Sequence, residues 1–169
     1  MISCALHIAV RWGAQESAEK LIKLGININA QNSAGKSPLA EAVIANKYEV
    51  TKYLLENGAD PNSCDANGIT ILMDTIRAQN AQIVKLLLNY GANPNLQQIN
   101  GQNAYHEAAY MGNTEIIALI RNAGGNPLSR DKEGNTPFSI VLNKDIKIIN
   151  EVLGNSYNIT ASDGNSPLH

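Results

Sequence analysis

The sequence predicts an all-α solenoid of stacked helix-turn-helix units, and three observations support this prediction. The phrase LLENGADPN at 54–62 returns 33 positions later, at 87–95, as LLNYGANPN. Glycines recur at the same interval in two further series: Gly25, Gly58, Gly91 and Gly124, then Gly35, Gly68, Gly101 and Gly134. An apolar series keeps this interval as well: Leu6, Leu39, Leu72, Tyr105 and Phe138. Because one unit cannot bury its apolar face alone, equal units are expected to stack on their neighbours.

The first helix of each unit is expected to begin at a capping side chain. In GKSPLAEAVIANK, the Ser37 hydroxyl can accept a hydrogen bond from the first turn, and Pro38 needs no amide donor there. Such a cap contributes about 1 kcal/mol. The same device predicts helix starts at two later pairs: Thr136-Pro137 and Ser166-Pro167.

The second helix is expected to end at a glycine. In AQIVKLLLNYG, four apolar side chains share one broad face: Ile83, Val84, Leu87 and Leu88. Gly91 follows them, because glycine most easily adopts the left-handed backbone that ends a helix. A polar segment then leads through ANPN to a turn at Gly101. Each unit is therefore predicted to be a helix, a turn, a second helix and an extended, β-hairpin-like finger.

Five segments resemble the TPLHxAAxxG signature of ankyrin repeats: ALHIAVRWG, SPLAEAVIAN, NAYHEAAYMGNTEII, NTPFSIV and NSPLH. The phrase LLENGADPN is similar to the LLxxGADVN of that family. The resemblance covers essentially the whole chain. It implies an ankyrin-repeat solenoid whose inner helices and fingers line a concave surface, and it implies that the chain binds other proteins.

The repeat interval predicts a single array over 1–169. Its units are expected near 1–31, 32–64, 65–97, 98–130 and 131–162, with the start of a truncated sixth near 163–169. Since the first unit has no finger before it, we expect either a fragment of a longer array or missing parts outside these residues. The fifth unit is three residues short and has Ser156 where the stop glycine belongs, so a weaker, more mobile C-terminal end is expected. Polar side chains are expected to cap the N-terminal end: Arg11, Glu16, Glu19, Lys20 and Lys23.

A helical wheel separates a buried arc of the first helix from an open one. Leu39, Ala42 and Val43 share the buried arc. The opposite arc, carried through the repeat, holds the residues that the resemblance assigns to partner binding on the concave face: Arg11, Trp12, Glu41, Ile44, Asp74, Arg77, Glu107, Tyr110 and Met111. The finger tips add a second set: Lys36, Asn67, Ile69, Gln102 and Lys132.

Two features of the open arc each have two interpretations. Large apolar side chains gather there: Trp12, Ile44, Tyr110 and Met111. Such side chains are typical of interface hot spots, but Trp12 could instead cap the end of the first unit, and isolated exposed apolar residues are ordinary. A column of acids follows the same arc: Glu41, Asp74 and Glu107. It favours a partner with Lys or Arg, but the helix dipole also favours a solvated carboxylate here, and Arg77 interrupts the negative field.

The histidines and cysteines do not predict a catalytic or metal site. His7, His106 and His169 hold the fourth position of the TPLH-like motif, where the resemblance implies that the imidazole braces neighbouring backbone. They fall in different units, so they do not converge. Cys4 and Cys64 have no metal-ligand spacing and are expected to be reduced thiols. No cofactor is expected, and the chain is not expected to be an enzyme.

Composition narrows the class of partner. A net charge of −2 argues against nucleic acid. No apolar run approaches the ~20 residues that span a bilayer, so membrane insertion is not expected. The N-terminus lacks a secretion signal, which favours an intracellular, cytoplasmic location, while delivery into a host cell as an effector stays open. The resemblance associates Asn29, Asn62 and Asn95 with asparaginyl hydroxylation, although hydrogen bonds of a finger turn explain them as well.

The leading hypothesis is a non-catalytic scaffold, monomeric alone, that binds another protein on its concave face. A rigid, preformed surface suits this role because it lowers the ordering cost of binding. The alternative is that the array forms the targeting or regulatory part of a larger enzyme or effector.

Overall fold

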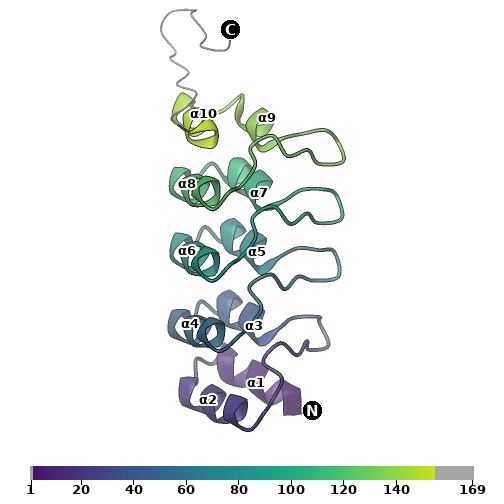
Figure 1. Ribbon diagram of the computed structural model, residues 1–169, viewed down its shortest axis with the longest axis vertical. Coiled ribbons are helices and arrows are strands. Elements are labelled where there is room, and N and C mark those ends of the chain that lie inside the picture. The colour runs from purple at the N-terminus through teal and green to yellow at the C-terminus, as the bar shows by residue number, and fades with distance from the viewer. Residues whose placement is uncertain (1, 155–169) are drawn as a thin grey trace, which may run out of the picture.

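The computed structural model describes residues 2–154, which form two columns of stacked helices with fingers projecting to one side (Figure 1). The odd-numbered helices make the column next to the fingers, and the even-numbered helices make the other. The helices are α1 Ile2–Arg11, α2 Gln15–Lys23, α3 Pro38–Ile44, α4 Tyr48–Glu56, α5 Ile71–Arg77, α6 Ala81–Asn89, α7 Ala104–Met111, α8 Thr114–Asn122, α9 Pro137–Val141 and α10 Ile146–Leu153. We number the pairs as units 1 to 5, from α1–α2 to α9–α10. The predicted all-α solenoid is confirmed, while the unit boundaries stay a prediction.

The predicted capping side chains begin the inner helices. The Ser37 hydroxyl accepts a hydrogen bond from the Ala40 amide at 3.2 Å, with Pro38 at the first helical position. Thr136 caps α9 in the same way. Ser166-Pro167 lies outside the described residues. In unit 4 the cap is Asn103, whose side chain accepts from the first turn while its own buried amide nitrogen has no partner.

Glycines end the outer helices with a left-handed backbone, as the repeat predicts. The φ angle is +92° at Gly58 and +91° at Gly91. Both amides bond back to the last turn, at 3.3 Å for Gly58 and 3.1 Å for Gly91. The corresponding position in the fifth unit, Ser156, lies outside the described residues.

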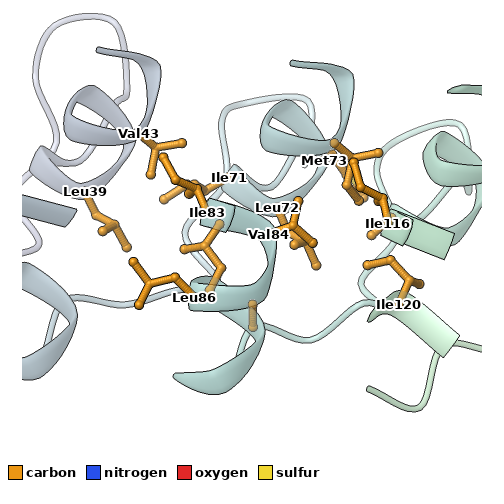
Figure 2. Packing of buried hydrophobic residues seen from close by; sticks show 14 of the residues in the cluster. Leu39, Val43, Ile71, Leu72, Met73, Ile83, Val84, Leu86, Ile116 and Ile120 are labelled. Carbon is orange, nitrogen blue, oxygen red and sulfur yellow. The ribbon is translucent and has the colours of Figure 1, made fainter. Parts of the chain in front are cut away.

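The core runs continuously between the two columns, because each unit packs its apolar side chains against the next (Figure 2). Leu39 and Leu72 are buried at equivalent positions of α3 and α5. Ile83 and Ile116, at equivalent positions of α6 and α8, are buried as well. Burying a side chain of this size contributes about 1.5–3 kcal/mol, so contacts between neighbouring units account for much of the stability.

An asparagine ladder joins the segments that follow the outer helices. The Asn62 side-chain oxygen accepts from the Asn93 backbone amide at 2.7 Å, and the Asn62 side-chain nitrogen donates to the Gly91 backbone carbonyl at 3.2 Å. Asn29 and Asn95 make the same pair of bonds to the units that follow them. The hydrogen bonds that explain these residues therefore reach between units as well as within a turn.

Each finger precedes the first helix of the unit to which we assign it, at 32–36, 65–69, 98–102 and 131–135 in units 2 to 5, and each closes with the same hairpin-like turn. In the finger of unit 3 the Asp65 amide donates to the Ile69 carbonyl at 3.0 Å, and the Gly68 amide donates to Asp65. Equivalent bonds close the turns at Gly35, Gly101 and Gly134. Within residues 2–154 the backbone forms no regular strand, and one isolated bridge joins Cys64 to Thr70.

Candidate protein-interaction surface

The surface formed by the fingers and the open side of α3, α5 and α7 is called the inner face below. Of the finger residues predicted to bind a partner, Asn67 and Lys132 are exposed. Lys36 and Gln102 are half-buried. Ile69 is half-buried and packs against the core, so it offers less surface than a finger tip would.

Two of the three predicted acids are buried by the same contact, which we call an arginine rung: an arginine of the preceding unit and a finger side-chain amide both donate to the carboxylate. The Arg11 Nε donates to a Glu41 carboxylate oxygen at 3.2 Å, from one unit to the next. The side-chain amide of Asn32, in the finger before α3, donates to the other carboxylate oxygen of Glu41 at 3.0 Å. Glu41 is only 7% exposed, so the expectation that it lies open on the arc is wrong.

The second rung repeats this arrangement two units later. The Arg77 guanidinium pairs with Glu107 of the next unit, and the finger amide of Gln98 lies 3.4 Å from the same carboxylate. Glu107 is 7% exposed, which again contradicts the open arc. Both arginines precede their glutamates by 30 residues, and both finger amides precede them by 9, so the sequence carried a signal that the helical wheel missed.

Between these rungs lies a junction where both donors are replaced. Ile44 stands where the arginine would be, 30 residues before Asp74, and Asp65 stands where the finger amide would be, 9 residues before it. Among the described residues, Asp74 has one ion pair, at 3.5 Å to the adjacent Arg77, which also serves Glu107. The Asp74 side chain is 49% exposed, whereas those of Glu41 and Glu107 are 10% exposed.

The pKa values of Glu41 and Asp74 shift in opposite directions. Burial alone would raise the pKa of Glu41, but the hydrogen bond and charge of Arg11, with the amide of Asn32, hold it below its ordinary value. Burial raises the pKa of Asp74, and repulsion from Asp65 adds to the rise, while Arg77 and other charges only partly oppose it. Glu41 thus has a hydrogen-bonded cation that outweighs its burial, whereas Asp74 has only the nearby charge of Arg77, which Glu107 shares.

Two hollows flank the open junction. One, about 40 Å³, lies between the fingers of units 2 and 3 and is lined by Ile44, Asp65 and Asp74 together with Lys36 and Cys64. The other, about 330 Å³, lies between the ends of α3 and α5. Ile44 and Asp74 line both.

The fingers also separate at this junction. The Ile99 amide donates to the Asn67 carbonyl at 2.9 Å, and Lys132 bonds Asn100 at the same distance, which joins the fingers of units 3, 4 and 5. No equivalent bond joins Ala66 to Ala34 between the fingers of units 2 and 3, which the structure describes fully.

The predicted apolar residues fall into three environments. Ile44 and Tyr110 are 53% and 46% exposed on the inner face. Met111 is half-buried and packs against the core. Trp12 is 79% exposed and lines a hollow with Ile8 and residues of α2, at the N-terminal end of the stack. The polar end cap expected at this end therefore leaves an apolar hollow between α1 and α2.

The histidines brace backbone, as expected. A ring nitrogen of His7 lies 2.9 Å from the Lys36 carbonyl, and one of His106 lies 3.1 Å from the Asn135 carbonyl, each in the following unit. His169 lies outside the described residues. Cys4 and Cys64 are free and exposed.

No metal-binding or membrane-spanning feature appears in the described part of the chain. Residues 2–154 contain no group of three metal-ligating side chains. None of the described helices is long and apolar enough to cross a bilayer.

The comparisons with known proteins agree with the fold. The family model described as ankyrin repeats (3 copies) matches residues 3–65 and 39–131. Rabankyrin-5 of Mus musculus is 40% identical over 50 residues, which are 30% of this chain and 4% of that protein. Rabankyrin-5 of Homo sapiens is 40% identical over 38 residues, or 22% of this chain and 3% of that protein. The chain thus matches only a small part of these relatives, but the repeat match extends over most of its own length: it belongs to the ankyrin-repeat family.

Proposed function

We propose that this chain is a non-catalytic protein-interaction module that binds a partner protein on its inner face. Ankyrin repeats are in general protein-interaction modules, and the family is typically non-catalytic. The observation that carries the proposal is the exposure of Ile44 and Tyr110 at equivalent positions of α3 and α7, beside polar groups whose positions are fixed by inter-unit bonds. Apolar anchors surrounded by ordered polar groups are the usual composition of an interface.

The surface is preformed, which supports a binding role. The fingers of units 3 to 5 are bonded to one another, and the arginine rungs fix the side chains beside α3 and α7. A partner that meets such a surface loses little free energy to ordering it.

A matched pair of tyrosine substitutions tests this proposal. Tyr110 is 46% exposed on the inner face, and Tyr90 is 37% exposed at the end of the outer helix α6. Lysate from the native source is passed over the parent chain, Tyr110→Ala and Tyr90→Ala, and bound proteins are quantified by mass spectrometry. We expect a bound protein whose recovery falls at least tenfold for Tyr110→Ala and stays near the parent level for Tyr90→Ala.

Circular dichroism melting of all three chains checks that folding is unchanged. Equal recovery on the parent and on Tyr110→Ala would contradict binding at this face, as would the recovery of no protein at all by the parent.

A second candidate is that the array targets or regulates a larger enzyme or effector. The match to relatives of which the chain covers only 3–4% favours it, since there the repeats form part of a far longer protein. The reading frame around this chain in its gene decides between the two, because a fused catalytic domain would establish the second.

A further inference from the structure

The junction between units 2 and 3 lacks three contacts that the junction between units 3 and 4 has, and the junction between units 1 and 2 has the first two of them. Its arginine is replaced by Ile44, its finger amide is replaced by Asp65, and its finger-to-finger bond is absent within the described fingers. The acid that these groups would serve, Asp74, is nevertheless present. We propose that a partner protein supplies the missing cation, by placing an arginine side chain over Ile44 so that its guanidinium meets Asp74 and Asp65.

The filled rungs show the chemistry that the open junction requires. In both, an arginine from the preceding unit reaches the carboxylate, and an amide from the finger completes its hydrogen bonds. At the open junction the carboxylate belongs to Asp74, whose side chain is one methylene shorter than that of Glu41 or Glu107. The Asp74 side chain is half-exposed, so a group from another molecule can reach it. The rungs thus act as an internal reference for which group belongs there.

The two hollows lie on either side of the position that the arginine would occupy. The hollow of about 40 Å³ has Asp65 and Asp74 among its lining residues, and the hollow of about 330 Å³ lies on the other side of Ile44. The aliphatic stem of an arginine can cover the exposed Ile44 while its charged end stays among polar groups. A planar guanidinium, with donors along several edges, can bond two carboxylates at once, which a lysine ammonium does less well.

The charges around the hollow favour a cation. Asp65 and Glu107 add their negative charge to that of Asp74, and Arg77 is already engaged by Glu107. Lys36 lines the smaller hollow and offsets part of this field, but the structure shows no ion pair from it to Asp65 or Asp74. A positively charged side chain from a partner would complete the balance that the neighbouring rungs already have.

This inference rests on the proposed function, and a small probe tests it separately. N-acetyl-arginine-N-methylamide is titrated into the isotope-labelled chain at constant ionic strength, with the citrulline analogue as its uncharged counterpart. NMR follows the Ile44 methyl and the Asp74 carboxyl carbon. We expect saturable shifts at both positions that are at least threefold larger for arginine than for citrulline.

Two variants and one control make the test specific. Asp74→Asn removes the acceptor and is followed at the Ile44 methyl, whereas Ile44→Arg fills the rung from within and is followed at the Asp74 carboxyl carbon. Each substitution should reduce the arginine-induced shift at the remaining reporter at least threefold. Glu115→Gln, an exposed acid at the start of α8, should leave them unchanged. Equal shifts with arginine and citrulline, or shifts that persist in Ile44→Arg, would overturn the assignment.

The two proposals can fail independently. If the probe does not bind but Tyr110-dependent capture persists, the inner face binds a partner without this arginine. If the probe binds but nothing is captured, the hollow accepts arginine while the proposed function fails.

Discussion

The junction between units 2 and 3 and the junction between units 3 and 4 are built from equivalent helices and have the same repeat length. Their contacts differ. At the 3–4 junction Arg77 pairs with a buried Glu107, and the Asn67 and Ile99 backbones join the fingers. At the 2–3 junction the rung lacks its arginine and the fingers are separate within the described residues. The comparison teaches that the repeat fixes the helix stack, whereas the side chains on the inner face decide which junction is open to another molecule.

Equivalent finger glycines should reveal the largest difference between the open 2–3 junction and a junction whose fingers are bonded, here the one between units 4 and 5. Gly35 and Gly101 both have positive φ, +74° and +82°. A Cβ at Gly101 would lie 2.9 Å from the Lys132 backbone nitrogen, whereas one at Gly35 would meet nothing within 4 Å. We expect Gly101→Ala to lower the free energy of unfolding by about 2–4 kcal/mol and Gly35→Ala by about 1–2 kcal/mol. Urea unfolding measures both, and equal losses would show that the fingers of units 4 and 5 do not pack as described.

Replacing the same position of two units by glutamine should give a smaller difference. Arg77→Gln leaves the buried Glu107 without its cation, which should cost about 1–2 kcal/mol, a range reduced because Arg77 is itself 38% exposed. Ile44→Gln changes an exposed side chain and should cost about 0.5 kcal/mol or less. Thermal or urea unfolding of the two variants compares them directly. A loss as large for Ile44→Gln would mean that the 2–3 junction is already closed.

The smallest expected effect is a titration difference between Glu41 and Asp74. The pKa of Glu41 should lie below its ordinary 4.5 and that of Asp74 above its ordinary 3.8. The stability that Glu41 contributes is therefore present above pH 4.5 and lost as the pH falls through its folded pKa. For Asp74 the sign reverses, because stability is highest with the acid protonated and is lost as the pH rises from 3.8 through its folded pKa. Carboxyl-carbon NMR titration measures both, and shifts of the same sign would contradict the contrast between the junctions.

The fold was predictable because its causes are local and repeated. A capping residue such as Ser37 and a stop glycine such as Gly91 act within a few residues of themselves, so a sequence period of 33 residues repeats the same helix starts and stops along most of the array. The candidate surface was only partly predictable. A helical wheel treats one helix alone and therefore placed Glu41 on the open side, whereas Arg11 and Asn32 from other segments bury it. The wheel likewise placed Trp12 on the open arc, whereas Trp12 lines a hollow with Ile8 and residues of α2.

The asparagine ladder has a consequence for how such a chain can change in length. The Asn62 side chain makes two hydrogen bonds with the segment one period later. Asn62 itself lies in the segment to which the Asn29 side chain is bonded. A gene duplication that copied one whole period would therefore add a new ladder asparagine together with the backbone groups to which the preceding asparagine bonds. Insertions of any other length would leave an amide without its match, so growth by complete periods is the route that this hydrogen-bond pattern tolerates.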